Sequence, residues 1–134
     1  MTQKGLNTRQ IKKVLICDDE PRARQALKAL LLTREVTCQD ESSSRIHVAA
    51  EARDGNEAVQ LVETILPEVV VIDALMPGMD GLEATRFIKK NWPEVRVVML
   101  TMHPDQRAAA LNAGADAFLL KGCLGETLIE TILG

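Results

Sequence analysis

The segment VVVIDALMPGMDG, residues 69–81, decides the fold of this chain. Four consecutive apolar residues, Val69 to Ile72, stop at Asp73, and a stretch rich in turn-forming residues follows. A short run that is apolar at every position is typical of a strand buried on both faces, and such strands occur mostly in parallel sheets covered by helices. We therefore expect an inner strand that ends at Asp73.

Three further apolar runs share this feature, because each stops at a polar residue. They are Val14 to Cys17, which stops at Asp18 and Asp19, Val97 to Leu100, which stops at Thr101, and Ala117 to Leu120, which stops at Lys121. Parallel strands end at one edge of a sheet, and open α/β folds bind ligands at that edge. If these strands share a sheet, three carboxylates, a hydroxyl and an ammonium group gather in one crevice.

Helical patterns separate these strands and a fifth strand, Ile46 to Ala50. Pro21 and Pro104 can occupy the first turns of helices, where the missing N–H costs nothing, and Asp54 and Asp80 have the positions of N-cap residues. Strand and helix alternate five times. This alternation predicts a doubly wound α/β fold with a parallel sheet, because βαβ crossovers are almost always right-handed and place helices on both faces.

Two segments depart from a compact pattern. Thr33 to Arg45 is polar and serine-rich, and indicates an extended helix end followed by a long loop. We expect this loop to be mobile and dispensable, near the end of the first helix that is remote from the crevice. The last helix, Leu124 to Leu133, lacks a good N-cap residue, so its start is expected to be weak.

The composition argues against several functions. A net charge of −3 with one Trp, two Phe and no Tyr disfavours nucleic-acid binding by this segment. No apolar stretch is long enough to span a bilayer, and residues 1–12 lack the apolar core of a secretory signal. We therefore expect a cytoplasmic domain over residues 13–134 behind a flexible basic leader. Cys17, Cys38 and Cys123 have no paired spacing and are expected to be reduced thiols.

The predicted crevice has the chemistry of a phosphoryl site. Carboxylates that lie so near to one another repel and require a counter-ion. Carboxylate, carbonyl and water ligands suit Mg²⁺. Lys121 and Thr101 add donors for phosphoryl oxygens, and Asp73 is the candidate nucleophile. A single Asp at a strand end is more often a turn former or a helix cap than a catalyst, but five polar residues on four strand ends favour a site.

Four motifs together resemble the receiver domain of two-component response regulators: DD at 18–19, VIDALMPGMDG at 71–81, LT at 100–101 and GADAFLLKG at 114–122. The resemblance implies a flavodoxin-like sheet of five parallel strands in the order 2-1-3-4-5 with five helices. It implies these roles: Asp73 as phospho-acceptor, Asp18, Asp19, Asp73 and the Leu75 backbone carbonyl as Mg²⁺ ligands, Lys121 as phosphoryl binder, and Thr101 and Phe118 as switch residues.

The family mechanism is implied in the same way. A sensor histidine kinase donates a phosphoryl group to Asp73, Thr101 is drawn toward it, and the ring of Phe118 turns inward. The face made of the fourth helix, the fifth strand and the fifth helix then changes its packing and binds a different partner. That partner can be a second copy of the chain, in a phosphorylation-dependent homodimer. Such a domain catalyses only its own phosphorylation and dephosphorylation.

Gly122 follows the lysine, where most receivers have proline. This residue and the segment at 78–103 resemble the NarL/FixJ subgroup, whose output domains are of the LuxR helix-turn-helix type. Two arrangements remain open: a natural protein that continues beyond Gly134 into a DNA-binding domain that controls transcription, and an orphan receiver.

Three other functions fit less well. Haloacid-dehalogenase-like phosphatases need a second Asp two residues after the nucleophile, where this chain has Leu75. A nucleotide or flavin binder would need a glycine-rich phosphate loop, which the sequence lacks. A degenerate receiver would have lost some of the polar positions, and all are filled here. Leu75 also cannot orient an attacking water, so we expect slow loss of phosphate. His103, two residues after Thr101, could orient a water instead, but we expect it to be an ordinary exposed residue at the start of the fourth helix.

Overall fold

Strands and helices alternate along the chain in this computed structural model, which describes residues 11–37, 45–123 and 125–134. The strands are β1 (Ile11–Cys17), β2 (Arg45–Ala52), β3 (Val69–Ile72), β4 (Arg96–Thr101) and β5 (Ala117–Leu120). The helices are α1 (Pro21–Thr37), α2 (Gly55–Ile65), α3 (Gly81–Asn91), α4 (Arg107–Asn112) and α5 (Gly125–Leu133), with a 3-10 turn at Pro104–Gln106.

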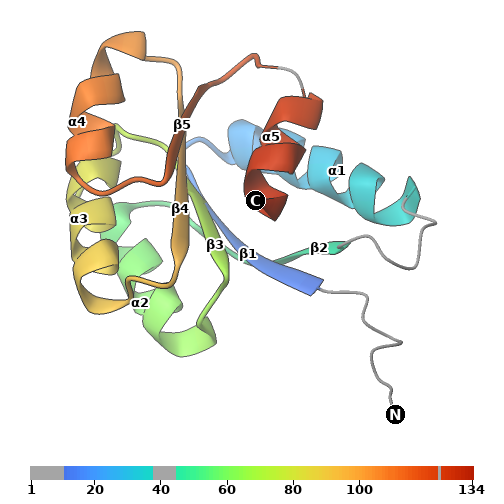
Figure 1. The fold of residues 1–134 in the computed structure, drawn as a ribbon, viewed down its shortest axis with the longest axis horizontal. Coiled ribbons are helices and arrows are strands. Elements are labelled where there is room, and N and C mark those ends of the chain that lie inside the picture. Colours follow the sequence, from blue (N-terminus) through green and yellow to red (C-terminus); the bar gives the residue numbers. More distant parts are fainter. Residues whose placement is uncertain (1–10, 38–44, 124) are drawn as a thin grey trace.

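The strands form one parallel sheet in the order β2-β1-β3-β4-β5. Helices α1 and α5 cover one face of this sheet, and α2, α3 and α4 cover the other, as Figure 1 shows. The predicted fold class and strand order are therefore confirmed. The order reverses between β1 and β3, and the carboxyl ends of these two strands bring Asp18 and Asp73 to the same edge.

The sheet separates two apolar cores, because successive side chains of a strand point to opposite faces. Leu15 and Cys17 belong to the core under α2, α3 and α4, whereas Val14 and Ile16 belong to the core under α1 and α5. All four are essentially inaccessible to solvent. Burial of each of the three aliphatic side chains, Val14, Leu15 and Ile16, stabilises the fold by about 1.5–3 kcal/mol relative to an exposed position, so β1 is firmly held.

Carboxylate caps start two helices where the sequence predicted them. Asp54 accepts a hydrogen bond from the Glu57 N–H, and Asp80 accepts one from the Glu83 N–H, both at 2.8 Å. Glu57 in turn accepts from the N–H of Arg53, one residue before the cap. The caps satisfy backbone donors that a helix leaves unpaired, and so they define where α2 and α3 begin.

Pro104 begins a 3-10 turn and not the expected helix, which starts only at Arg107. His103 provides no side-chain cap, and the Gln106 N–H bonds the carbonyl of His103, three residues back. An uncapped first turn closes in this tighter form.

Some expectations fall outside the described residues: those for Leu124, for the 38–44 part of the long loop and for residues 1–10 of the leader. The remaining leader residues, 11 and 12, belong to β1. None of the helices that the structure describes is long and apolar enough to cross a membrane.

Candidate functional site

The polar residues at the strand ends are held by continuations of the sheet's hydrogen bonding. The N–H of Asp18 donates to the carbonyl of Ala52, and the N–H of Asp73 donates to the carbonyl of Cys17. The N–H of Lys121 likewise donates to the carbonyl of Thr101, at 2.8 Å. The backbones of these residues are therefore as fixed as the strands, and their side chains start from defined positions.

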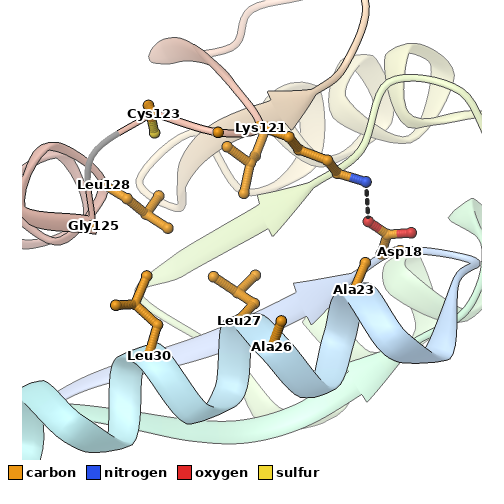
Figure 2. A pocket seen from close by; sticks show the side chains of 11 residues that line it. Asp18, Ala23, Ala26, Leu27, Leu30, Lys121, Cys123, Gly125 and Leu128 are labelled. Atoms are coloured by element: carbon orange, nitrogen blue, oxygen red, sulfur yellow. Dashed lines mark hydrogen bonds and ion pairs between the residues drawn. The ribbon is translucent and has the colours of Figure 1, made fainter.

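Lys121 reaches across this edge to two carboxylates. Its Nζ lies 2.6 Å from Oδ2 of Asp18 and 2.9 Å from Oδ2 of Asp73. Figure 2 shows the contact with Asp18. Burial by itself favours the neutral amine, but the hydrogen bonds to Asp18 and Asp73 outweigh it and raise the pKa of Lys121 above its usual value. The pocket therefore contains a permanent ammonium group.

The three predicted carboxylates lie together. One oxygen each from Asp18, Asp19 and Asp73 can be chosen so that all lie within 4.8 Å of one another. Asp18 and Asp73 are buried, whereas Asp19 is exposed. The carboxylate of Asp19 makes no hydrogen bond to any other described residue, so it remains available to a cation. This all-oxygen donor set could hold a hard divalent metal ion.

The start of α3 packs against the backbone of Asp73. A Cβ atom on Gly81 would collide with the Asp73 carbonyl oxygen, so only glycine fits this position. The Gly81 N–H also donates to the carbonyl of Ala74 at 2.8 Å. On the side-chain end, Oδ1 of Asp73 accepts from the N–H of Leu75 at 3.3 Å. Both the backbone and the carboxylate of Asp73, the candidate acceptor, are thus held in place. The Leu75 side chain is 41% exposed.

Thr101 is the last residue of β4, and Phe118 lies in β5. Thr101 is fully buried, and its hydroxyl accepts from the N–H of His103 at 3.4 Å. Phe118 is also buried, in the core under α2, α3 and α4, and the guanidinium carbon of Arg107 lies 5.8 Å from its ring centroid. The ring is therefore already directed inward in this structure.

Sequence reasoning missed one residue at the site, Arg24 of α1. Its Nη1 donates to the backbone carbonyl of Asp18 at 2.6 Å, and its Nε donates to Glu51 of β2 at 3.2 Å. No local pattern reveals these partners, because Glu51 lies 27 residues away along the chain.

The structure also forms an apolar hollow of about 260 Å³ between α1 and α5, next to Lys121 (Figure 2). Leu27, Leu30 and Leu128 line its middle.

A family model described as "Response regulator receiver domain" matches residues 14–133. The chain belongs to the response regulator receiver domain family. The receiver resemblance of the sequence is thereby confirmed.

Curated relatives of this receiver domain are transcriptional regulators. It is 34% identical over 123 residues to the transcriptional regulatory protein LnrK of Bacillus subtilis, covering 90% of this chain and 52% of that protein. It is 33% identical over 122 residues to the response regulator protein VraR of Staphylococcus aureus, covering 90% of this chain and 54% of that protein. The chain spans about half the length of the curated relatives it matches.

Solved structures give the same picture of the receiver domain. The signal receiver domain of the putative response regulator NarL from Mycobacterium tuberculosis superposes with a TM-score of 0.79 at 27% identity, covering 93% of this chain and 98% of that one. A DNA-binding response regulator of the LuxR family from Staphylococcus aureus has a TM-score of 0.76 at 29% identity, covering 92% and 99%. The predicted NarL/LuxR-type relationship is therefore confirmed.

Proposed function

We propose that this receiver domain is a phosphorylation-dependent switch of a two-component system, and that Asp73 accepts the phosphoryl group from a sensor histidine kinase. The observation that carries the proposal is the ammonium group of Lys121, which lies 2.9 Å from Oδ2 of Asp73 inside a pocket of three carboxylates. A buried nucleophile with a fixed cation beside it can accept a group that carries several negative oxygens.

A carboxylate oxygen of Asp73 forms a bond to phosphorus while the bond from phosphorus to the kinase imidazole nitrogen breaks, and that nitrogen takes a proton from solvent. The product is an acyl phosphate on Asp73. Lys121 donates hydrogen bonds to the phosphoryl oxygens. The domain would catalyse only its own phosphorylation and dephosphorylation, because Leu75 leaves no second carboxylate for the turnover of other substrates.

The acidic pocket fits Mg²⁺, because its donors are all oxygens and three of them lie within 4.8 Å of one another. Asp18, Asp19 and Asp73 would hold the ion, together with the backbone carbonyl of Leu75. When bound, the ion supplies neutralisation of the negative charge on the phosphoryl oxygens.

The proposed output is a change in the face made of α4, β5 and α5. The buried hydroxyl of Thr101 would move toward the new phosphoryl group and draw the β4–α4 segment with it. Phe118 already lies inward, so the movement of Thr101 is the step that phosphorylation adds. Since LnrK is a transcriptional regulator and the Staphylococcus aureus neighbour is DNA-binding, we propose transcription in the cytoplasm as the controlled process.

In this proposal DNA is bound by a C-terminal helix-turn-helix domain outside the present chain and not by the acidic receiver itself. The altered face would also support a homodimer that forms on phosphorylation.

Intact-mass measurement after treatment with acetyl phosphate and Mg²⁺ tests the acceptor. The native chain should gain one phosphate, and Asp73→Asn should gain none although its fold is retained in circular dichroism. Replacing Mg²⁺ with EDTA should abolish labelling of the native chain. Phosphate that persists on Asp73→Asn would place the acceptor elsewhere and overturn the proposal.

A further inference from the structure

We infer that Arg24 is a positioning residue for the cation pocket: by holding the peptide between Asp18 and Asp19, it orients the Asp19 carboxylate toward a bound divalent ion. This inference rests on the proposed function, since it concerns the Mg²⁺ that the pocket would hold. Arg24 belongs to α1 and touches no phosphoryl or metal ligand atom, so its effect passes through the backbone.

The contacts of Arg24 tie three elements together. Its Nη1 donates to the Asp18 carbonyl oxygen at 2.6 Å, and its Nε donates to Oε1 of Glu51 at 3.2 Å. The side chain of Arg24 is only 16% exposed, unusually low for an arginine near a surface. The planar guanidinium presents both donors in a fixed fork, so the two contacts set one geometry for the loop that follows β1.

Every polar atom of Asp18 is held in a different way. Its N–H bonds Ala52, its Oδ1 accepts from the N–H of Glu20 at 2.9 Å, and its Oδ2 accepts from Lys121. The carbonyl is the remaining group, and Arg24 takes it. Asp18 needs no further help to stay in place, so the importance of the Arg24 contact lies in what comes next along the chain.

Asp19 depends on that contact. Its carboxylate makes no hydrogen bond to any other described residue, and its side chain is exposed. The carbonyl oxygen of Asp18 and the N–H of Asp19 belong to one planar peptide group, so fixing the oxygen fixes the plane from which Asp19 departs. Arg24 is thus the contact that limits where the Asp19 carboxylate can point.

The carboxylate of Glu51 pairs with two cations of α1 through separate oxygens, Oε1 with Arg24 and Oε2 with Lys28. Lys28 Nζ lies 2.8 Å from Oε2 of Glu51, so one carboxylate is shared by two cations of α1. Lys28 makes no contact with Asp18. It therefore offers a matched control, because Lys28→Ala removes the same positive charge from the same carboxylate without releasing the Asp18 carbonyl.

A purely electrostatic role of Arg24 and a positioning role predict opposite changes in the affinity for Mg²⁺. If Arg24 acted only as a positive charge near the pocket, its removal would strengthen the binding of Mg²⁺. If it positions Asp19, its removal weakens binding, and loss of a residue that orients metal ligands typically costs about 10- to 100-fold in affinity. The direction of the change therefore distinguishes the two roles.

Isothermal titration of the unphosphorylated chain with MgCl₂ tests the inference. Arg24→Ala should raise the Mg²⁺ dissociation constant about tenfold, and Lys28→Ala should leave it unchanged. Arg24→Lys keeps the charge but cannot bridge both partners, so it should also bind Mg²⁺ more weakly than the native chain. Melting curves in EDTA establish whether each variant is folded. If Arg24→Ala does not fold, the Mg²⁺ affinity of Arg24→Lys tests the inference instead.

Glu51→Gln and Arg24→Ala together allow a double-mutant cycle on the affinity for Mg²⁺. Because Glu51 acts through Arg24, the double variant with Arg24→Ala should bind Mg²⁺ no more weakly than Arg24→Ala alone. In acetyl phosphate labelling, the Arg24 variants should need more Mg²⁺ for half-maximal rate, yet reach nearly the native rate at saturation.

Native Mg²⁺ affinity in Arg24→Ala or in Arg24→Lys would overturn the inference and leave the proposed function intact. Failure of the native chain to bind any Mg²⁺ would overturn the proposed metal site and, with it, this inference.

Discussion

Nζ of Lys121 lies 2.6 Å from Oδ2 of Asp18, the shorter of its two carboxylate contacts. A metal ion bound in the proposed site would therefore compete with the lysine for the negative charge of the pocket. Lys121→Gln should bind Mg²⁺ several-fold more tightly than the native chain, because the carboxylates lose their internal counter-ion. The same variant should be phosphorylated about a hundredfold more slowly, since it has lost a donor to the transferring group.

Titration calorimetry and labelling by acetyl phosphate measure the two effects on Lys121→Gln separately. Lys90→Gln, an exposed residue in the last turn of α3 with the same charge change, is the control and should alter neither. Weaker Mg²⁺ binding in Lys121→Gln would contradict the competition described here.

The phosphate on Asp73 should be long-lived because of Leu75. This side chain, two residues after Asp73, is 41% exposed and has no polar group to orient a water for attack. Leu75→Asn should shorten the lifetime of the phosphate several-fold, and His103→Ala should leave it unchanged because His103 lies exposed at the solvent side. Lifetimes follow from intact mass after removal of acetyl phosphate. Decay of the native phosphoprotein within seconds in Mg²⁺ would refute this assignment.

Gly81 should tolerate no side chain. A methyl group there would collide with the Asp73 carbonyl oxygen, so Gly81→Ala must displace either α3 or Asp73. We expect a loss of more than about 3 kcal/mol in the free energy of unfolding by urea, beyond the usual cost of overpacking, because the obstacle is backbone.

Gly78 is the matched control for Gly81. It has a positive φ of 73° but open space around it, so Gly78→Ala should cost only about 1–2 kcal/mol. Equal losses in the two variants would contradict an extra cost from the close approach of Gly81 to the Asp73 backbone.

Cys17 should make the fold less stable at alkaline pH. Burial, followed by the negative charge of Asp18, raises the pKa of this thiol far above its ordinary value of 9.0. Above pH 9 the unfolded chain loses the proton while the folded chain keeps it, so stability falls as pH rises, by up to about 1 kcal/mol per pH unit. Below pH 9 both states carry the proton and the effect is absent.

Urea unfolding of the native chain and of Cys17→Ala at pH 8 and pH 10 measures this dependence. The stability advantage of the native chain should shrink between the two pH values. Lys121 and the remaining cysteines are common to both proteins, so parallel curves would exclude Cys17 as the source.

The strands and most of the pocket could be predicted because each depends on a short segment. A run such as Val69 to Ile72 is buried on both faces wherever it pairs, and the next residue necessarily lies at the carboxyl edge of a parallel sheet. This is why Asp73 and Lys121, 48 positions apart, could be expected to meet. The N-caps Asp54 and Asp80 were equally local, since each bonds an N–H three residues ahead.

The remaining features depend on contacts that no local pattern encodes. Arg24 meets Glu51 only because α1 packs over the β1 and β2 edge, and its position in α1 does not distinguish it from an exposed arginine. The inward ring of Phe118 depends on the space left by neighbouring residues and on Arg107 above it. Pro104 permitted a helix start, but the absence of a cap at His103 produced a 3-10 turn.

The division of the interior by the sheet has a consequence for how this domain can evolve. Met99 and Phe118 lie in one compartment, whereas Val98 and the α5 residues Ile129 and Ile132 lie in the other. Side chains in separate compartments share no packing partners. Selection can therefore adjust how tightly α5 is anchored without changing the packing around the Phe118 ring.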